Sequence, residues 1–152
     1  MSTNLPRVSL YTDGSCIKNP GPGGWAYILV HEGNEKKDSG CEQSSTNSRM
    51  EIKAVLEGLR ALKKPCAVKI YSDSEYVINT IEKWLEGWKK QRFKGKANVD
   101  LWREYIELSK DHKISTKHIK AHTGHKYNER CDKMALAAAR SVILDDGSGS
   151  LI

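Results

Sequence analysis

Residues 7–13 read Arg7-Val8-Ser9-Leu10-Tyr11-Thr12-Asp13, and this stretch decides the fold. Apolar or β-branched side chains occupy positions 8, 10 and 12, a period of two that is typical of a strand with one buried face. The stretch ends in an acid followed by Gly14. A carboxylate at the end of a buried strand has no evident structural duty, so Asp13 is the first candidate for a functional residue.

The segments after this strand predict an antiparallel meander. Residues 19–24 (Asn-Pro-Gly-Pro-Gly-Gly) are a dense turn signal, and the apolar run at 25–30 reads as a second strand. Gly33-Asn34 is a candidate hairpin turn that leads to a third strand near residues 36–43. Short links between consecutive strands favour antiparallel pairing.

The rest of the chain alternates between helical and strand patterns. Leu and Val residues at helical spacing predict a helix over 48–63, which Pro65 ends. The other predicted elements are a strand at 68–71, a helix at 74–88, a helix from Asp100, a strand at 114–120 and a helix at 128–143. The order βββαβααβα predicts an α/β fold with a five-stranded mixed sheet flanked by helices. We expect one domain over residues 1–140 and a disordered polar tail over 141–152.

The composition describes a soluble protein of one domain. A chain of 152 residues can bury a real core, and no apolar run approaches the roughly 18 residues of a membrane span. The first residues lack the apolar core of a secretory signal, so a cytoplasmic location is expected. The cysteines form no CxxC pair, which argues against zinc and favours free thiols; they are Cys16, Cys41, Cys66 and Cys131.

The charge pattern favours a polyanionic partner. The net charge is +6 with a pI near 9.1. Five cations lie between residues 89 and 96 without an acid among them, and Trp88 and Phe93 are interleaved with them. Such a run can be a plain solvated loop. The aromatic rings shift the interpretation toward nucleic acid, because cations meet phosphates while rings pack on sugars or bases.

Four acids stand in different local settings, namely Asp13, Glu51, Asp73 and Asp132. Each has a structural alternative: Glu51 fits a capping box with Ser48, Asp73 could cap the following helix, and Asp132 could be a first-turn acid favoured by the helix dipole. Two strand ends and two helix starts can, however, meet at one edge of an α/β sheet, where ligand sites collect. Four carboxylates at one point repel each other unless cations hold them, so the arrangement predicts a divalent metal site.

The sequence around these acids resembles the type 1 ribonuclease H family, and most closely its stand-alone bacterial members. The resemblance runs in order from residue 7 to about residue 140. The matching segments are Tyr11-Thr12-Asp13-Gly14-Ser15-Cys16, Asn19 to Gly24, Thr46-Asn47-Ser48-Arg49-Met50-Glu51, Ser72-Asp73-Ser74-Glu75-Tyr76-Val77, Asn98-Val99-Asp100-Leu101-Trp102, His122-Thr123-Gly124-His125 and Asn128-Glu129-Arg130-Cys131-Asp132.

The resemblance implies an endonuclease that hydrolyses the RNA strand of RNA–DNA hybrids and leaves 5′-phosphate and 3′-hydroxyl ends. It implies that the four acids hold two Mg²⁺ ions, with Mn²⁺ as a possible substitute; both prefer hard oxygen ligands. His122 matches a mobile catalytic histidine that assists proton transfer or product departure. His125 is its rival, but the spacing to Asp132 favours His122. A monomer is expected.

The resemblance also assigns substrate contacts. It places Cys16, Asn19 and Asn47 in the minor groove, where 2′-hydroxyls distinguish RNA, with Asn79 as a further candidate there. The resemblance assigns Asn128 to the substrate without a specified groove. It places Trp84, Lys89 and Lys90 in a basic protrusion that grips the DNA strand. Trp84 and Trp88 also fall on the apolar side of their predicted helix. A position in the core is therefore the alternative interpretation for Trp84, and it is the preferred interpretation for Trp88.

This chain departs from the family pattern at two places. Glu75 stands at a position assigned to substrate contact, where many relatives carry glutamine. A carboxylate can accept a hydrogen bond there but cannot donate one. The basic protrusion is also shorter, which predicts either a lower affinity for the hybrid or a shallower salt dependence of binding, because fewer phosphates are neutralised. Two competing functions remain at this point: a related polynucleotidyl transferase or DNA nuclease on the same fold, and a non-catalytic hybrid-binding module.

Overall fold

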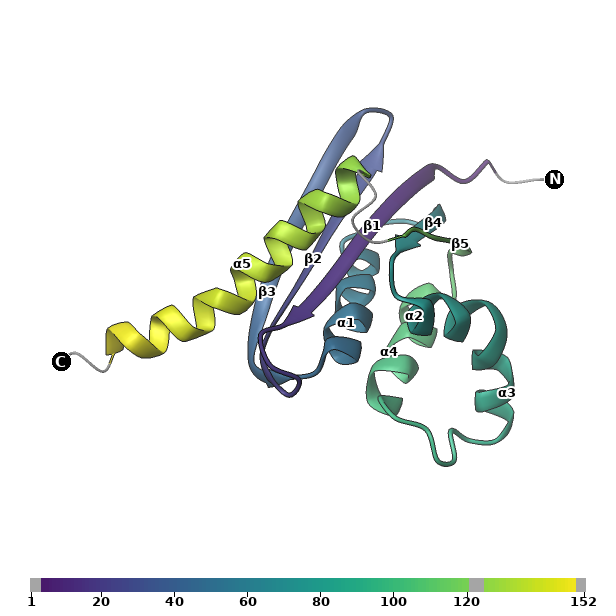
Figure 1. The fold of residues 1–152 in the computed structure, drawn as a ribbon. Coiled ribbons are helices and arrows are strands. Elements are labelled where there is room, and N and C mark those ends of the chain that lie inside the picture. Colours follow the sequence, from purple (N-terminus) through teal and green to yellow (C-terminus); the bar gives the residue numbers. More distant parts are fainter. Residues whose placement is uncertain (1–3, 121–124, 150–152) are drawn as a thin grey trace.

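The computed structural model describes residues 4–120 and 125–149, and contains one sheet of five strands (Figure 1). The order across the sheet is β3-β2-β1-β4-β5. β1, β2 and β3 form the expected antiparallel meander, whereas β4 and β5 run parallel to β1. The predicted mixed sheet of an α/β fold is thereby confirmed. The strands are β1 (Arg7–Cys16), β2 (Gly21–His31), β3 (Asn34–Ser45), β4 (Ala67–Ser72) and β5 (Lys113–His118).

The helices follow the predicted order with two differences. They are α1 (Asn47–Arg60), α2 (Glu75–Asn79), the π-helical segment η1 (Thr80–Trp84), α3 (Leu85–Lys90), α4 (Val99–Ser109) and α5 (Lys126–Gly149). The helix expected at 74–88 is therefore three consecutive pieces with a wider π turn in the middle. α5 continues to Gly149, although the polar composition predicts a disordered tail from residue 141; Val142 is still buried, which ties the helix to the body beyond that point.

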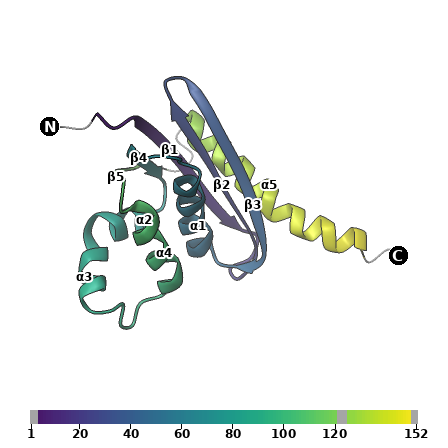
Figure 2. The same ribbon diagram turned by 180° about the vertical axis from the view of Figure 1, so that it is seen from behind.

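The two faces of the sheet carry separate hydrophobic clusters. Alternate residues of each strand point to opposite faces, so Leu10 and Leu29 pack against α1, while Ala26 and Ile28 meet Cys131 of α5. Both faces of β2 are covered, which explains why residues 25–30 read as a continuous apolar run. α1 and α5 lie on opposite sides of β1, β2 and β3 (Figures 1 and 2).

A glycine allows α5 to lie close to the sheet. A Cβ atom built on Gly24 of β2 would stand 2.1 Å from the carbonyl oxygen of Ala135. The small residues of the Ala-rich helix and this glycine therefore bring the two backbones together. No helix among residues 4–120 and 125–149 is long and apolar enough to cross a membrane.

Candidate metal and nucleic-acid site

Asp13 and Glu51 meet where β1 passes the first turns of α1. The backbone N–H of Gly14 donates to Glu51 Oε1 at 2.6 Å and also to Asp13 Oδ1 at 2.9 Å. A Cβ atom on Gly14 would stand 2.3 Å from the Met50 carbonyl carbon and 2.4 Å from the Glu51 nitrogen. Only glycine therefore lets the strand approach α1 closely enough for the two carboxylates to come together.

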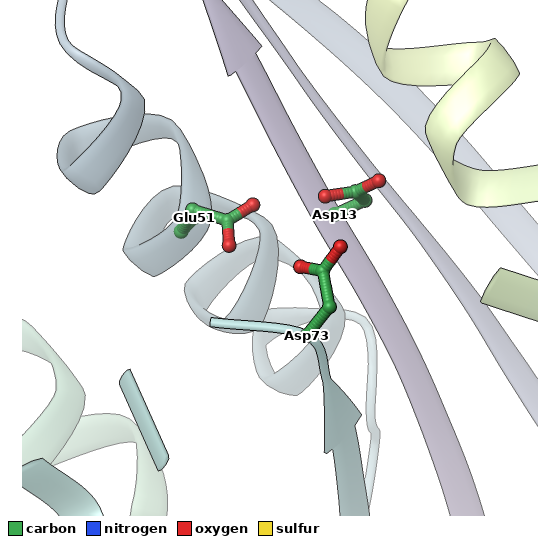
Figure 3. A group of neighbouring side chains, drawn as sticks. All are labelled: Asp13, Glu51 and Asp73. Carbon is green, nitrogen blue, oxygen red and sulfur yellow. The ribbon is translucent and has the colours of Figure 1, made fainter. Parts of the chain in front are cut away.

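Asp73 joins this pair from the end of β4. Because β4 is the parallel neighbour of β1, the two strands end at the same edge of the sheet. One carboxylate oxygen from each of Asp13, Glu51 and Asp73 lies within 4.8 Å of the other two, and the three side chains point toward a common space (Figure 3).

Asp132 of α5 completes the group. A hollow of about 290 Å³ is lined by all four acids together with Gly14, Ser15, Asn47, Ser48 and Ser74. The four carboxylates predicted to converge are thus in one place, although they come from two strands and two helices.

The local structure does not support the structural alternatives for these acids. The N-cap of α1 is Thr46, whose hydroxyl accepts from the Arg49 N–H, and Glu51 is engaged by Gly14 instead. The N-cap of α2 is Ser74, whose hydroxyl accepts from the Val77 N–H. α5 begins at Lys126, so Asp132 lies in its second turn and not its first.

The electrostatics of the group disfavour several ionised carboxylates at once. Asp13 is 5% exposed and Glu51 is 9% exposed. Burial raises the pKa of Asp13 to about 7, and the charges of Asp73 and Asp132 add to this rise. Burial, followed by the charge of Asp13, holds the pKa of Glu51 well above its usual range. Two like charges 4 Å apart cost roughly 4 kcal/mol at an effective dielectric constant of 20.

No protein cation balances the two most buried acids. Among residues 4–120 and 125–149, neither Asp13 nor Glu51 forms an ion pair with lysine or arginine. Among the described residues 4–120 and 125–149, the ligand atoms around the hollow are hard carboxylate oxygens without a thiolate or imidazole, which suits Mg²⁺ or Mn²⁺. The residues present therefore fit a divalent ion.

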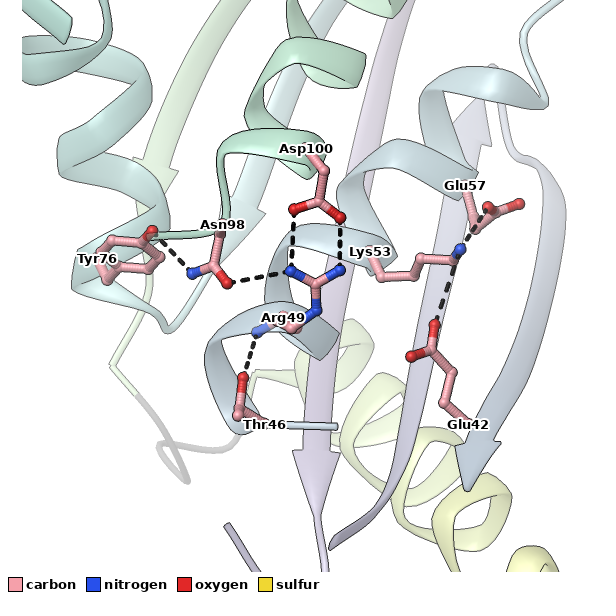
Figure 4. A network of polar contacts seen from close by, with 8 residues as sticks. All are labelled: Glu42, Thr46, Arg49, Lys53, Glu57, Tyr76, Asn98 and Asp100. Carbon is pink, nitrogen blue, oxygen red and sulfur yellow. Dashed lines mark hydrogen bonds and ion pairs between the residues drawn. The ribbon is translucent and has the colours of Figure 1, made fainter. Parts of the chain in front are cut away.

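A polar network holds the start of α1 against α4. Arg49 binds Asp100 through both terminal nitrogens, at 3.0 and 2.7 Å (Figure 4). Asn98 accepts a weaker hydrogen bond from Arg49 and donates to the Tyr76 hydroxyl, which also accepts from the Trp102 indole. The network joins the helix that carries Glu51 to α2, which begins just after Asp73.

The residues assigned to the minor groove are joined by hydrogen bonds. The Asn47 side-chain oxygen accepts from the Cys16 N–H at 2.8 Å, and the Asn47 N–H donates to the Asn19 side-chain oxygen at 3.0 Å. Asn47 also lines the carboxylate hollow. The three residues thus form a continuous polar rim beside the acids. Glu75 is exposed at the start of α2 and Asn79 is half-buried at its end.

The predicted basic protrusion is exposed. Lys89 and Lys90 lie at the end of α3 on the surface. Trp84 is 41% exposed, so it is not a core residue, and its ring stacks on Trp88 with centroids 6.1 Å apart. Trp88 packs partly against the core, as expected, and Lys96 lies over its ring at 5.0 Å.

Two predicted site residues differ from expectation or fall outside the description. Asn128, expected to contact substrate, is only 3% exposed because α5 begins at Lys126 and turns this position toward the sheet. Its side-chain oxygen has no hydrogen-bond partner within residues 4–120 and 125–149. His122 lies outside the described residues. Its rival His125 accepts from the Asn128 N–H through Nδ1.

Sequence reasoning missed several contributors to the site. Gly14 was noted only as a neighbour of Asp13, and the signal was a glycine directly after a strand-ending acid. The Arg49–Asp100 pair joins residues 51 positions apart, which a single sequence does not reveal.

Comparison with known proteins identifies the family. The family model described as RNase H matches residues 6–140. The chain belongs to the RNase H family. The resemblance to type 1 ribonuclease H and the expectation of an enzyme of that class are thereby confirmed.

Members of the RNase H family from several bacteria are similar along most of the chain. Ribonuclease HI of Campylobacter jejuni subsp. jejuni serotype O:2 is 50% identical over 138 residues, which cover 91% of this chain and 94% of that protein. Ribonuclease H of Thermoanaerobacter pseudethanolicus is 50% identical over 141 residues, covering 89% and 91% respectively.

Solved structures agree with this assignment. LC9-RNase H1, a type 1 RNase H with the type 2 active-site motif, superposes with a TM-score of 0.84 at 26% identity over 93% of this chain and 75% of its own. LC11-RNase H1 in complex with an RNA/DNA hybrid superposes with a TM-score of 0.72 over 90% of this chain and 99% of its own; its 20% identity shows the fold alone.

The raised pKa values predict how stability depends on pH when no divalent ion is present. Between roughly pH 4, the ordinary value for aspartate, and about pH 7, folded Asp13 binds more protons than it does in the unfolded chain. Stability should therefore fall as pH rises through this window. We expect the melting temperature in chelator to drop toward neutral pH, and to drop less in Asp13→Asn.

Thermal melts followed by circular dichroism across the window check this prediction. Acids with lowered pKa values, such as Asp100 beside Arg49, stabilise the fold less as pH falls. Their contribution is the same in wild type and in Asp13→Asn. The difference between the two melting curves therefore isolates the carboxylate group. Parallel curves for wild type and Asp13→Asn would contradict the prediction.

Proposed function

We propose that this RNase H-family protein is an endonuclease that hydrolyses the RNA strand of RNA–DNA hybrids, leaving 5′-phosphate and 3′-hydroxyl ends. The observation that carries the proposal is the hollow in which Asp13, Glu51, Asp73 and Asp132 converge beside a polar rim. The solved complex of LC11-RNase H1 with an RNA/DNA hybrid supports the substrate class by analogy of fold.

The four acids would hold two Mg²⁺ ions, or Mn²⁺ in their place. When bound, such a pair activates a water and stabilises the leaving 3′-oxygen of a phosphodiester. Asp13 interacts with each of the other three acids and is the residue that would be least replaceable. The Gly14 N–H holds the Glu51 and Asp13 carboxylates in a fixed relation, so that the ligand set is ordered in advance.

The remaining residues would position the substrate and move a proton. Asn47, Asn19 and Cys16 present a rim next to the acids at which the 2′-hydroxyls of the RNA strand could be recognised. Asn79 and Glu75, at opposite ends of α2, would extend this rim, with Glu75 limited to accepting hydrogen bonds. We assign proton transfer or product departure to His122, since an imidazole titrates near neutral pH.

A cleavage assay tests the proposal. RNA–DNA hybrid, duplex DNA and duplex RNA, each with an end label on either strand, are incubated with Mg²⁺ or with chelator. We expect cleavage of the RNA strand of the hybrid alone, only with Mg²⁺, and products that a kinase labels only after their 5′-phosphates are removed. Cleavage of duplex DNA would instead identify a DNA nuclease, and tight binding without cleavage would identify a binding module.

The basic protrusion predicts the salt dependence of hybrid binding. Lys89→Ala with Lys90→Ala is expected to lower the slope of log affinity against log salt by about 1.8, since each phosphate contact contributes about 0.9. The loss of affinity should be largest at low salt. Fluorescence anisotropy of a labelled hybrid in chelator, repeated over a range of salt concentrations, measures the affinity and its slope.

The chain offers a matched control for this variant. Lys63 and Lys64 are also adjacent exposed lysines, and they follow the opposite end of α1 from the acids. Their replacement by alanine removes the same charge without touching the protrusion. Equal slopes for wild type and the Lys89/Lys90 variant would show that the segment is a solvated loop.

A further inference from the structure

One face of the sheet is only partly covered. α5 packs across β1, β2 and β3, and both views place it away from β4 and β5 (Figures 1 and 2). The strand register aligns alternate residues of β1, β4 and β5 on this face. We call these positions the open face: Arg7, Ser9, Tyr11, Ala67, Lys69, Tyr71, Lys113, Ser115 and Lys117.

The open face is basic. Four of its residues are cations, all of them exposed, and none of its residues is an acid; the cations are Arg7, Lys69, Lys113 and Lys117. Within the described part of the chain, none of the four forms an ion pair. Arg7 and Lys69 line a hollow of about 270 Å³ with Val8, Ser9, Ala67 and Ser115. Clustered positive charges without a carboxylate partner repel one another, so they favour an anionic ligand.

Protection of the sheet edge explains only part of this pattern. Lysines on an edge strand discourage pairing with other chains, and this accounts for Lys113 and Lys117 of β5. Arg7 and Lys69 lie on β1 and β4, which have a neighbouring strand on each side and no edge to protect. Their cations call for another explanation.

Aromatic rings share the same surface. Tyr71 is half-buried and stacks on Tyr11 with centroids 4.5 Å apart, and Tyr11 stacks in turn on Tyr127 of α5. Lys69 Nζ lies 5.6 Å from the centre of the Tyr71 ring. A sheet face that combines rings with cations suits single-stranded nucleic acid, whose bases are free to stack while its phosphates meet lysine and arginine.

The open face and the carboxylate hollow share strands β1 and β4. Asp13 and Asp73 each stand two residues beyond Tyr11 and Tyr71 on the same strands. Lys69 is four residues from Asp73, or about 13 Å along the strand. A polynucleotide that reaches the four acids therefore has a basic path for the segment beyond the cleavage site.

We propose that the open face binds single-stranded nucleic acid, and specifically the unpaired strand that extends from a hybrid held at the acids. The location of the hybrid rests on the proposed function, whereas binding to the open face does not. The phosphates of a duplex could also contact the cations, but its paired bases are not free to stack on the tyrosine rings. The expected ligand is therefore an unpaired segment.

Salt-dependent binding of a labelled oligouridylate in chelator tests the cations. Lys69→Gln with Lys117→Gln is expected to lower the slope of log affinity against log salt by about 1.4, because each contact to a single strand contributes about 0.7. Lys36→Gln with Lys37→Gln removes the same charge from β3, at the opposite edge of the sheet, and should leave the slope unchanged. No change in the first variant, or equal changes in both, would overturn the proposal.

A second variant tests the ring. Tyr71→Leu is expected to weaken oligouridylate binding at least about fivefold without changing the salt slope, since stacking involves no charge. Binding of an abasic oligonucleotide should stay the same. Equal losses for both oligonucleotides would exclude base stacking and overturn the proposed recognition. Circular dichroism confirms that each variant is folded.

Cleavage kinetics separate this inference from the proposed function. Wild type should show a lower KM for a hybrid with a single-stranded extension than for a blunt hybrid, and Lys69→Gln with Lys117→Gln should lose that difference. A wild-type enzyme that cleaves both hybrids with equal KM would overturn the inference alone. A protein that binds oligouridylate through the open face but cleaves no hybrid would overturn the proposed function alone.

Discussion

Asp13→Asn is expected to abolish hybrid cleavage, with a loss on the order of a thousandfold or more. The amide keeps the size of the side chain but removes one charge from the group that would hold the divalent ions. Metal ions supply several kcal/mol of transition-state stabilisation, and each 1.4 kcal/mol is a factor of ten in rate. Activity within tenfold of wild type would refute the role of Asp13.

Two further measurements show that such a loss is specific. Hybrid affinity in chelator should stay close to that of wild type, because the rim and the basic protrusion are unchanged. The unfolding temperature in chelator should rise at neutral pH, because the variant removes repulsion between buried carboxylates. A variant that had simply lost its fold would melt at a lower temperature.

A useful control replaces an acid outside the group. Asp100→Asn also removes one carboxylate charge, but this residue binds Arg49 at the surface and does not line the hollow. Its ion pair is half-exposed, so its loss should cost no more than about 1 kcal/mol of stability. Divalent-ion binding followed by calorimetry should therefore be lost in Asp13→Asn and retained in Asp100→Asn.

Local patterns in the sequence predicted the sheet because the strands are regular. Alternation in residues 7–13 and the turn signals around 19–24 and 33–34 correspond to β1, β2 and β3 within a few residues. The convergence of the acids was also predictable, since parallel strands end at one edge. What the sequence could not show is the close approach that Gly14 permits, because this depends on how α1 packs on β1.

The region of Trp84 shows where periodicity fails. Spacings of four, three and four place Val77, Ile81, Trp84 and Trp88 on one side of a regular helix. The π turn at Thr80–Trp84 adds residues per turn and shifts the phase, so that Leu85 is buried and Trp84 is exposed. A single ring thus moves from a candidate core position to the surface that carries the basic protrusion.

Helix ends were the other source of error. Ser48 and Asp73 were plausible caps by residue type, but Thr46 and Ser74 occupy those positions. Several residues with capping side chains stand close together in both segments, and tertiary contacts decide among them. At the start of α5, Asn128, which the resemblance makes a substrate contact, is buried.

Gly14→Ala is expected to disrupt both the site and the fold. The added Cβ would stand 2.3 and 2.4 Å from backbone atoms of Met50 and Glu51. Backbone cannot move aside as a flexible side chain does, so α1 must shift away from β1. Overpacking of this kind costs about 3 kcal/mol, which corresponds to a melting temperature lower by roughly 10 °C for a chain of this size.

The same shift should separate Glu51 from Asp13, because the Gly14 N–H that holds both carboxylates moves with the strand. Gly14→Ala should then lose cleavage activity, as Asp13→Asn does, even at temperatures where it remains folded. Mg²⁺ should also stabilise Gly14→Ala less than it stabilises wild type. Gly87→Ala is the matched control, since no atom lies within 4 Å of its added Cβ. In the middle of α3 it should raise stability by up to about 1 kcal/mol. If Gly14→Ala melted and cleaved like Gly87→Ala, strand and helix would not be held as closely as the site requires.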